Sequence, residues 1–393
     1  MNTTPNSNRL YISIFGRTNV GKSTLLNTLT GQYSAIVSKT PGTTTDPVNK
    51  PIEINGLGAC VITDTAGFDD ITSLASQRIN KTEIVLDKTD IAVVLFNDSD
   101  ITIESEWIKK LQKRTIPFLA CITKKDLGEN KELYEKIKTQ FGVTPLYFSA
   151  SDEVLRENLI KKLISLVPED FGTQSITAKL VSENEHVLLV MPQDLQAPKG
   201  RLILPQVQTI RDLLDNKCIV TSCTLTSLEK ALSLSKEPPS LIITDSQIFK
   251  EVYEMKSEKS RLTSFSVLFA QYKGDINEFI SGANALNSLG EHAKILIAES
   301  CTHVPLGEDI GRVKIPVLLK KRLGNNITID NVSGTDFPKD LKKYDLIVHC
   351  GACMFNRKFV CSRIALAKEA NVPITNYGVL IAFLSGILEK IEY

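Results

Sequence analysis

The fold of this chain is decided by the stretch "RLYISIFGRTNVGKSTLLNTL", residues 9–29. An apolar, β-rich run leads into Gly16-x-x-x-x-Gly21-Lys22-Ser23, and a segment with helical apolar periodicity follows. A strand, a glycine-containing loop and a helix are the context of a P-loop, whose backbone N–H groups cradle phosphates at the helix N-terminus. We predict that Lys22 reaches the β- and γ-phosphates and that the Ser23 hydroxyl ligates Mg²⁺. The residues predicted to line the nucleotide here are Gly16, Arg17, Thr18, Asn19, Val20, Gly21, Lys22, Ser23 and Thr24.

Two further predicted strands end in polar residues that suit a nucleotide. "ACVITDTAG" (59–67) ends with Asp64, which can hold the Mg²⁺ shell, and Gly67, whose N–H can meet the γ-phosphate. "FLACITKKD" (118–126) ends with Asp126, whose carboxylate can accept hydrogen bonds from both N1 and N2 of guanine. Adenine lacks that pair of donors, so the pattern favours GTP over ATP.

A fourth predicted strand, "PLYFSAS" (145–151), brings Ser149 and Ala150 to a position where they can close over the base. Thr123 and Lys124 belong to the same base-binding group as Asp126. Each motif lies at the carboxyl end of its strand, which is where open α/β sheets bind ligands. The four motifs in this order therefore predict a nucleotide site along one edge of a mostly parallel sheet.

These motifs resemble those of the TrmE–Era branch of P-loop GTPases over about residues 8–168. The resemblance implies a Ras-like domain whose catalytic residues are Lys22, Thr44 and Gly67, with Thr44 of "PGTTTD" (41–46) as a Mg²⁺ ligand beside Ser23 and Asp64. Asn19 matches the P-loop asparagine that ligates K⁺ in cation-activated members. An ordinary polar loop residue is the alternative reading.

Two positions set the expected rate and affinity within that resemblance. Phe68 follows "DTAG", where other GTPases carry a glutamine that orients water, so hydrolysis should be slow unless K⁺ or a partner completes the site. The alternative for Phe68 is a core residue of the switch. Thr123 replaces the usual asparagine, which should weaken one contact to the base while Asp126 still selects guanine.

The middle of the chain, residues 173–260, reads as repeated strand–helix pairs and predicts a small α/β domain. It carries no recognisable acid–base pair. His186 is interpreted as structural, and Cys218 and Cys223 as core residues rather than ligands. The domain is either an oligomerisation surface or a spacer.

The last part, residues 261–393, contains "HCGAC" (349–353). The strand "AKILIAES" (293–300) is followed by Cys301 and His303, and the strand "YDLIVHC" (344–350) ends in His349 and Cys350, with Cys353 just beyond. If these strands are parallel neighbours, about 4.8 Å apart, the five side chains can converge on one metal centre.

Three interpretations of this group remain open. The cysteines could be small buried hydrophobes. A structural zinc site would need four ligands in a tetrahedron. A 4Fe–4S cluster could take three thiolates, with an imidazole or an exogenous ligand on the fourth iron. Cys361, on the following predicted helix, is interpreted as a packing residue.

The spacing Cys301-x-His303, then His349-Cys350-x-x-Cys353, behind such a GTPase domain resembles the HydF family of FeFe-hydrogenase maturation GTPases. The stretch "APKGRLILPQVQTIRDLLD" (197–215) is also similar to that family. The resemblance implies a 4Fe–4S cluster on Cys301, Cys350 and Cys353, with His303 or His349 as candidate fourth ligand. It also implies a homodimer through the middle domain. The implied cargo is a diiron precursor, accepted from radical-SAM maturases and delivered to the apo-hydrogenase.

Composition limits the other classes of function. Hydrophobic residues make up 42% and charged residues 23% of the chain, and the net charge is +1. We therefore expect a cytoplasmic protein without membrane or nucleic-acid partners. The main alternative is an RNA-linked GTPase of the TrmE–Era kind with a zinc-stabilised C-terminal domain. It would need a basic surface, and the sequence offers only short groups such as "LLKKRLG" (318–324). A radical-SAM enzyme would need a CxxxCxxC motif, which is absent.

The sequence thus predicts an α/β protein of three domains. These are a P-loop GTPase domain (residues 1–172), a dimerisation domain (173–260) and an iron–sulfur cluster-binding domain (261–393). The predicted cofactors are GTP or GDP, Mg²⁺, K⁺ as an activator, and the cluster.

Overall fold

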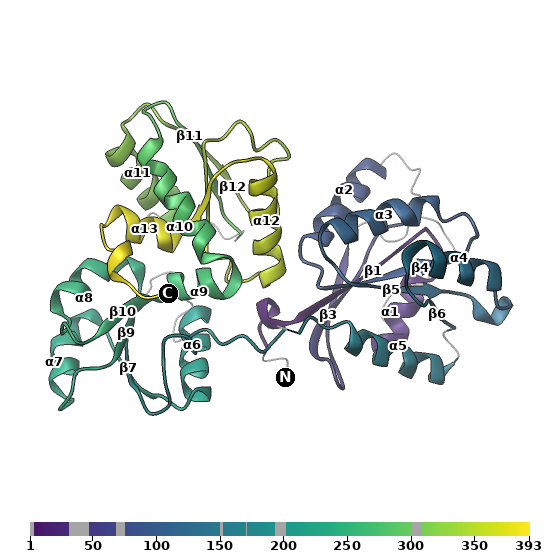
Figure 1. Ribbon diagram of the computed structural model, residues 1–393, viewed down its shortest axis with the longest axis horizontal. Helices are drawn as coiled ribbons and strands as arrows, with labels where there is room; N and C mark the ends of the chain where they lie inside the picture. Colours follow the sequence, from purple (N-terminus) through teal and green to yellow (C-terminus); the bar gives the residue numbers. More distant parts are fainter. Residues whose placement is uncertain are drawn as a thin grey trace. The chain divides into compact units, whose positions relative to one another are not determined.

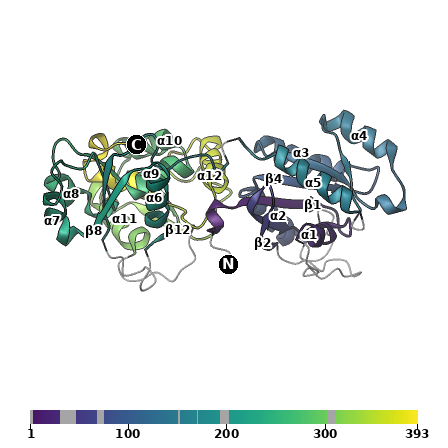
Figure 2. The same ribbon diagram turned by 90° about the horizontal axis from the view of Figure 1, so that it is seen from below.

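The computed structural model describes residues 4–30, 47–67, 75–149, 152–169, 171–192, 202–300 and 309–393. The chain forms two compact units, one ending at Thr173 and the other running from Gln174 to Tyr393 (Figures 1 and 2). None of the described helices has the length and apolar composition that crossing a bilayer would require.

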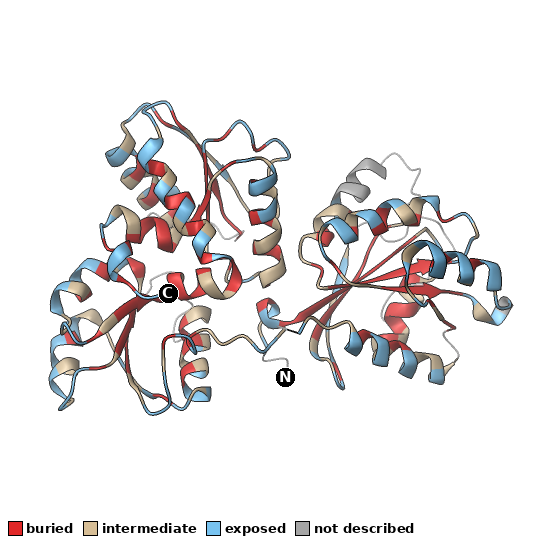
Figure 3. Cartoon of the chain, viewed as in Figure 1, coloured by how far each residue is buried: buried red, intermediate tan, exposed pale blue. Residues whose placement is uncertain are grey.

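The first unit is built on a six-stranded sheet in the order β2-β3-β1-β4-β5-β6, in which only β2 runs antiparallel to its neighbour. The central strands are buried along their whole length, because helices cover both faces of the sheet (Figures 1 and 3). The strands are β1 (Leu10–Gly16), β2 (Val48–Ile54), β3 (Gly58–Asp64), β4 (Ile91–Phe96), β5 (Phe118–Ile122) and β6 (Leu146–Tyr147). The mostly parallel sheet predicted from the four motifs is confirmed.

Two apolar cores hold the helices of this unit to the sheet. Leu25 of α1 and Leu163 of α5 belong to one core. Trp107 of α3 and Ile137 of α4 belong to the other, on the opposite face. The helices are α1 (Lys22–Thr30), α2 (Ala75–Leu86), α3 (Thr102–Lys113), α4 (Lys131–Phe141) and α5 (Glu153–Ser165).

The second unit contains two four-stranded sheets, and the first has the order β10-β9-β7-β8 with all strands parallel. Its strand β10 lies just past residue 260, where the sequence predicted a domain boundary. His186, at the start of β7, bonds through Nε2 to Thr221 Oγ1 at 2.9 Å. The elements are β7 (His186–Val190), α6 (Leu204–Asp215), β8 (Ile219–Cys223), α7 (Leu228–Ser233), β9 (Leu241–Thr244), α8 (Phe249–Met255), β10 (Arg261–Ser264) and α9 (Phe265–Lys273).

The second sheet of this unit has the order β12-β11-β13-β14, again all parallel. The strands expected to carry the metal ligands, β11 and β13, are direct neighbours, with Ala298 opposite His349. The elements are α10 (Ile276–Asn284), β11 (Lys294–Ala298), α11 (Ile315–Leu323), β12 (Thr328–Val332), β13 (Leu346–His349), α12 (Arg357–Glu369), β14 (Ile374–Asn376) and α13 (Tyr377–Leu384).

One apolar core joins the two sheets of the second unit. It includes Leu188 and Ile242 from the first sheet and Leu296 and Ile347 from the second. Near the end of the chain, the Glu392 N–H donates to the Leu262 carbonyl at 2.9 Å, which attaches this end to β10. Residues 174–393 therefore pack as a single body, although they contain two sheets.

Candidate functional site

The P-loop connects the end of β1 to the start of α1, and its backbone takes conformations that few residues tolerate. Gly16 has φ +154° and Gly21 has φ +106°, while Asn19 has φ +59°. A Cβ at Gly16 would lie 2.8 Å from Cγ1 of Val20. The Val20 side chain itself is buried in the core beneath the loop, so Val20 can contribute only its backbone to a ligand.

Lys22 holds the loop closed from within. Its Nζ donates to the carbonyls of Gly16 at 3.1 Å and Arg17 at 2.7 Å. The ammonium group therefore lies at the N-terminus of α1, where helix geometry favours a bound anion. This is the position at which the sequence predicted the phosphates.

Ser23 and Asp64 meet as the sequence predicted for Mg²⁺ ligands. The Ser23 hydroxyl donates to Asp64 Oδ2 at 2.6 Å, and Asp64 is only 2% exposed. Among the described residues its second oxygen, Oδ1, has no hydrogen-bond partner. Burial raises the pKa of Asp64, and the Ser23 hydroxyl and Lys22 oppose that rise. A buried carboxylate oxygen next to a hydroxyl is an oxygen donor set of the kind Mg²⁺ prefers, so these residues fit the ion.

Gly67 follows β3 and lies directly against the P-loop. A Cβ at this position would come within 2.7 Å of the Thr18 backbone nitrogen. Only glycine therefore allows this approach to the phosphate-binding loop. Thr44 and Phe68 lie outside the described residues.

The predicted base-binding residues gather at the ends of β5 and β6. Thr123 Oγ1 donates to the Phe96 carbonyl at 3.3 Å, and its methyl carbon would lie 3.9 Å from a Cβ on Gly21 of the P-loop. Lys124 is left-handed, with φ +60°. The Asp126 side chain is exposed, and Ser149 Oγ lies 3.5 Å from its Oδ1. Ala150, the remaining predicted residue, lies outside the described residues.

Arg17 points away from the loop that contains it. Its Nε donates to Glu104 Oε1 of α3 at 2.8 Å, and its guanidinium also contacts Asp100. The hydrogen bond to Glu104 raises the pKa of Arg17. Sequence reasoning missed Glu104, because only the strand order brings α3 beside the P-loop. Thr24, one turn into α1, accepts a hydrogen bond from Thr28 Oγ1 at its carbonyl oxygen.

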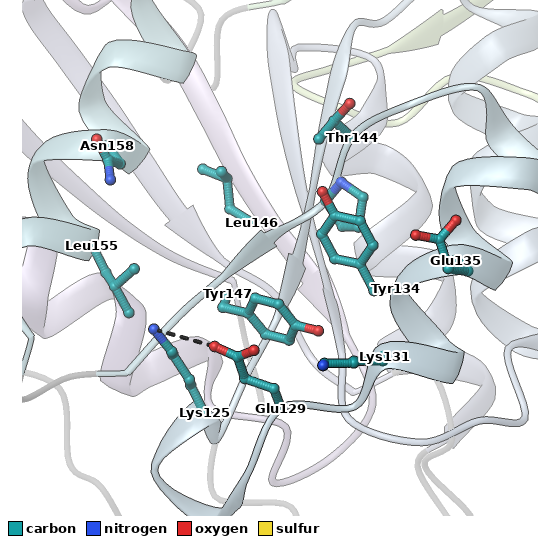
Figure 4. A pocket seen from close by; sticks show the side chains of 11 residues that line it. Lys125, Glu129, Lys131, Tyr134, Glu135, Thr144, Leu146, Tyr147, Leu155 and Asn158 are labelled. Atoms are coloured by element: carbon teal, nitrogen blue, oxygen red, sulfur yellow. Dashed lines mark ion pairs between the residues drawn. The ribbon is translucent and has the colours of Figure 1, made fainter.

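A pocket of about 590 Å³ lies beside the base-binding loops, between α4, β6 and α5 (Figure 4). Tyr134 and Tyr147 stack in it with ring centroids 5.6 Å apart, and Lys125 pairs with Glu129 at 3.7 Å. None of the residues predicted to contact the nucleotide lines this pocket.

The second candidate site lies in the second unit, at the carboxyl edge of the sheet β12-β11-β13-β14, where β11 and β13 end. The condition on which the sequence argument depended, that these strands are parallel neighbours, is met. The Cys350 N–H donates to the Ala298 carbonyl at 3.0 Å, which extends the pairing to the cysteine. Cys301 and His303 lie outside the described residues, so the five-ligand group stays a prediction. Within the described ranges, no group of three or more His, Cys, Asp or Glu side chains could hold a metal ion.

The sulfur of Cys350 accepts two backbone hydrogen bonds. The Ser300 N–H lies 3.0 Å away and the Ala352 N–H 3.4 Å away. Ala352 has φ +45°, so the turn after Cys350 is held in a left-handed conformation. Desolvation raises the pKa of Cys350, and the hydrogen bonds from Ser300 and Ala352 lower it.

Ser300 offers a further polar group at this edge. Its side chain is buried, and its Oγ makes no hydrogen bond of good geometry with the described residues, but the hydroxyl lies close enough to the Cys350 thiol to lower the pKa of that thiol. Backbone N–H groups aimed at a cysteine sulfur are one of the features that tune protein-bound iron–sulfur clusters. The N–H donors at Cys350, the Ser300 hydroxyl beside its thiol and the nearby Cys353 together fit a thiolate-bound cluster.

His349 is buried, and each of its two ring nitrogens has a hydrogen-bond partner. Nδ1 lies 2.6 Å from the Cys350 carbonyl, and Nε2 lies 3.1 Å from Nη1 of Arg363. Burial, together with the positive charge of Arg363, lowers the pKa of His349 to about 3. The neutral ring therefore donates from Nδ1 and accepts at Nε2, which leaves no lone pair for a metal in this conformation.

Arg363 is itself buried, on α12. Its guanidinium lies over the rings of Phe337 and Phe359, at 4.7 and 4.3 Å from their centroids. It also donates to the Gly334 carbonyl at 2.8 Å. Sequence reasoning missed this residue, since nothing in the run of α12 marks one arginine as buried.

The sequence predicted that three further cysteines, Cys218, Cys223 and Cys361, are packing residues. Cys218 is buried in the core of the first sheet of this unit, and Cys223 packs against the shared core. Cys361 lies on α12, with its Sγ 3.7 Å from the Lys273 carbonyl.

Comparison with known proteins assigns each part of the chain. Residues 11–124 match the family model described as "50S ribosome-binding GTPase". A tRNA modification GTPase MnmE from Heliobacterium modesticaldum is 32% identical over 142 residues, which is 36% of this chain and 30% of the relative. A GTPase Der from Campylobacter concisus is 31% identical over 186 residues, covering 45% of this chain and 40% of the relative. The chain thus spans about a third of the length of these curated relatives.

Among solved structures, Era from Aquifex aeolicus bound to GDP and aluminium fluoride is 26% identical, with a TM-score of 0.35. The match covers 40% of this chain and 57% of the Era chain. The RNA-linked alternative is not favoured by the rest of the comparison, because the GTPase relatives match only the first part of the chain.

The second unit matches two consecutive family models. Residues 176–274 match the "Hydrogen maturase F dimerization domain" and residues 277–392 match the "Hydrogen maturase F tetramerization domain". Both support formation of oligomers, and the second extends the homodimer expected from the sequence. With a match to a GTPase family model followed by matches to both of these domains, the chain belongs to the hydrogen maturase F family, the FeFe-hydrogenase maturation GTPases.

Proposed function

We propose that this protein is a GTP-hydrolysing carrier for FeFe-hydrogenase maturation. In this proposal it holds a 4Fe–4S cluster on Cys301, Cys350 and Cys353. Its substrate is a diiron precursor supplied by radical-SAM maturases, which it passes to the apo-hydrogenase. The observation that carries the proposal is the edge formed by β11 and β13, where two backbone N–H groups donate to the sulfur of Cys350.

The roles at the cluster site follow from the contacts of its residues. The N–H groups of Ser300 and Ala352 stabilise the thiolate of Cys350, and the Ser300 hydroxyl adds a further donor beside that sulfur. When bound, the cluster supplies an iron with one exchangeable coordination position. Arg363 holds His349, and His349 orients Cys350 through its backbone carbonyl rather than serving as the fourth ligand, because both ring nitrogens are engaged.

At the nucleotide site, the chain's own groups bind and orient GTP. Lys22 and the loop N–H groups hold the phosphates, Ser23 and Asp64 hold Mg²⁺, and the N–H of Gly67 meets the γ-phosphate. We propose slow hydrolysis, stimulated by K⁺ at Asn19. The nucleotide state would then change the contacts with partner proteins.

The experiment that tests the cluster is anaerobic reconstitution with iron and sulfide, followed by metal analysis and EPR spectroscopy of the reduced protein. We expect a 4Fe–4S signal that is lost in Cys350→Ser. The matched control is Cys223→Ser, since Cys223 packs against the core at the end of β8, in the other sheet of this unit.

Two outcomes would contradict the proposal. Uptake of zinc without an EPR signal would point to a structural metal site and to the RNA-linked GTPase weighed from the sequence. A 4Fe–4S signal that persists unchanged in Cys350→Ser would mean that the cluster is bound elsewhere.

A further inference from the structure

Lys273, the last residue of α9, is a buried cation that reaches the loop carrying Cys350 and Cys353. It is 2% exposed. Its Nζ donates to three backbone carbonyls of that loop, those of Ala352 at 2.9 Å, Cys353 at 3.1 Å and Phe355 at 2.9 Å. One side chain therefore holds three carbonyl groups of the short backbone stretch around the second cysteine.

The three contacts account for the charge of this lysine. An ammonium group has three N–H donors and no acceptor, whereas a neutral amine has only two donors. With three carbonyl oxygens as partners, every donor of the ammonium form is used. The Phe269 ring lies beside it, with its centroid 5.8 Å from Nζ. A buried ammonium is costly without such compensation, so the contacts hold a positive charge at the loop.

A second cation makes a reciprocal contact between the loop region and the end of α9. Arg357, at the start of α12 just after the loop, donates through Nη1 to the carbonyls of Tyr272 and Gly274, both at 3.1 Å. These carbonyls lie at the C-terminus of α9, where a cation is favoured by the helix dipole. Two cations thus join the end of α9 to the cysteine loop. Lys273 of α9 donates to carbonyls of the loop, and Arg357, just after the loop, donates to carbonyls at the end of α9.

This arrangement crosses the division between the two family domains. Lys273 belongs to the segment that matches the dimerization domain, residues 176–274, while its three partners belong to the segment that matches the tetramerization domain. A residue at the end of one domain therefore supports the ligand loop of the next.

We propose that Lys273 is a positioning residue for the cluster, which holds the Cys350–Cys353 loop in its ligand-bearing conformation and sets a positive charge beside the bound cluster. This inference rests on the cluster assignment proposed above. The reduced cluster carries one more negative charge than the oxidised one. A nearby buried cation therefore stabilises the reduced form and raises the reduction potential.

The test uses two variants of the full-length protein and a matched control. Lys273→Met removes both donors and charge, while Lys273→Gln keeps donors and removes the charge, and serves also if the Met variant folds poorly. The control is Lys256→Met. Lys256 lies in the same unit and also donates to two backbone carbonyls, those of Ser257 at 3.1 Å and Ser260 at 2.8 Å.

Two readouts are measured. In the protein without cluster, amide hydrogen exchange over residues 350–356 should be at least about tenfold faster in Lys273→Met, because the carbonyl contacts are lost. In the reconstituted protein, the reduced-to-oxidised ratio at a fixed potential should fall about tenfold in both Lys273 variants. For a one-electron couple this equals about 59 mV toward more negative potential. Lys256→Met should match the wild type in both readouts.

The outcomes separate this inference from the function on which it rests. An unchanged reduction potential in both Lys273 variants would overturn the inference, whatever the exchange rates. If the wild-type protein takes up no cluster at all, the proposed function fails. The exchange measurement then decides whether Lys273 holds the loop, and unchanged exchange would overturn that part too.

Discussion

Two lysines perform the same structural task in the two candidate sites, but they come from different places in the sequence. Lys22 donates to two carbonyls of its own loop, six and five residues away. Lys273 donates to three carbonyls of a loop about 80 residues further along the chain. The nucleotide site is therefore closed by a local motif, and the cysteine loop is closed by a neighbouring element.

This difference determines what each site can tolerate. In the P-loop, side chain, loop and helix N-terminus are contiguous, so a substitution should change ligand binding more than folding. At the cysteine loop, the supporting cations Lys273 and Arg363 are both buried, so a substitution should change folding and ligand geometry together.

The largest effect is expected for Lys22→Met. Removing the ammonium from the phosphates should lower the rate of GTP hydrolysis about 100- to 1,000-fold, with little change in melting temperature. Phosphate release and thermal unfolding measure the two quantities. Lys125→Met is the control, because Lys125 lines the separate pocket and pairs with Glu129. A melting temperature that drops together with activity would contradict the expectation that a P-loop substitution changes ligand binding more than folding.

Arg363→Met should affect mainly the fold. Loss of the buried guanidinium, with its contacts to His349 and two phenylalanine rings, should lower the free energy of unfolding by about 2–4 kcal/mol. Urea unfolding of the protein without cluster measures it. Arg261→Met is the control, since its ion pair with Glu185 is partly exposed and should contribute less than about 1 kcal/mol. Equal losses in the two variants would contradict the role assigned to Arg363.

Asn19→Gly should abolish the stimulation of GTP hydrolysis by K⁺ over Na⁺ while leaving the slow basal rate. Glycine is the suitable replacement, because residue 19 has φ +59° and alanine would strain the loop. Hydrolysis rates in the two salts are compared at equal ionic strength. Stimulation that survives the change would show that the asparagine is only a polar loop residue.

The smallest effect is expected for Thr123→Asn. The amide adds hydrogen-bonding groups at the base site, so affinity for GDP should rise about two- to tenfold. Titration with a fluorescent GDP analogue measures it, with an ADP analogue as the control for base selectivity. A weaker affinity would mean that the packing of Thr123 near Gly21 matters more than the added hydrogen bonds.

The sequence predicted the parts of both sites that are local. Asp64 and Thr123 each follow an apolar strand, and the parallel order of those strands brings them to one edge. The parallel pairing of β11 with β13, which the sequence argument took as its condition, brings Cys350 to the end of β11 in the same way. Such predictions succeed because a strand end and its polar residue are adjacent in the chain.

What the sequence could not supply are contacts made across the fold. Lys273 ends an apolar helix, where a lysine is ordinarily solvated, and nothing in "FSVLFAQYK" marks it as buried. Glu104 and Arg363 each lie on a helix with several charged residues, and nothing in the sequence distinguishes the buried one from the others. The membership of β10 in the sheet with β9 also depends on tertiary pairing, since the charged segment 254–264 reads as a boundary.

The shared core of the second unit has a practical consequence for the design of protein fragments. A fragment starting at residue 277 would retain the whole cysteine motif and would look like a self-contained cluster module. It would nevertheless expose apolar side chains that pack against Leu188 and Ile242, and it would leave Lys273 behind. Cluster reconstitution on such a fragment would report on a ligand loop without its anchor, so fragments should begin before β7 rather than at the domain boundary.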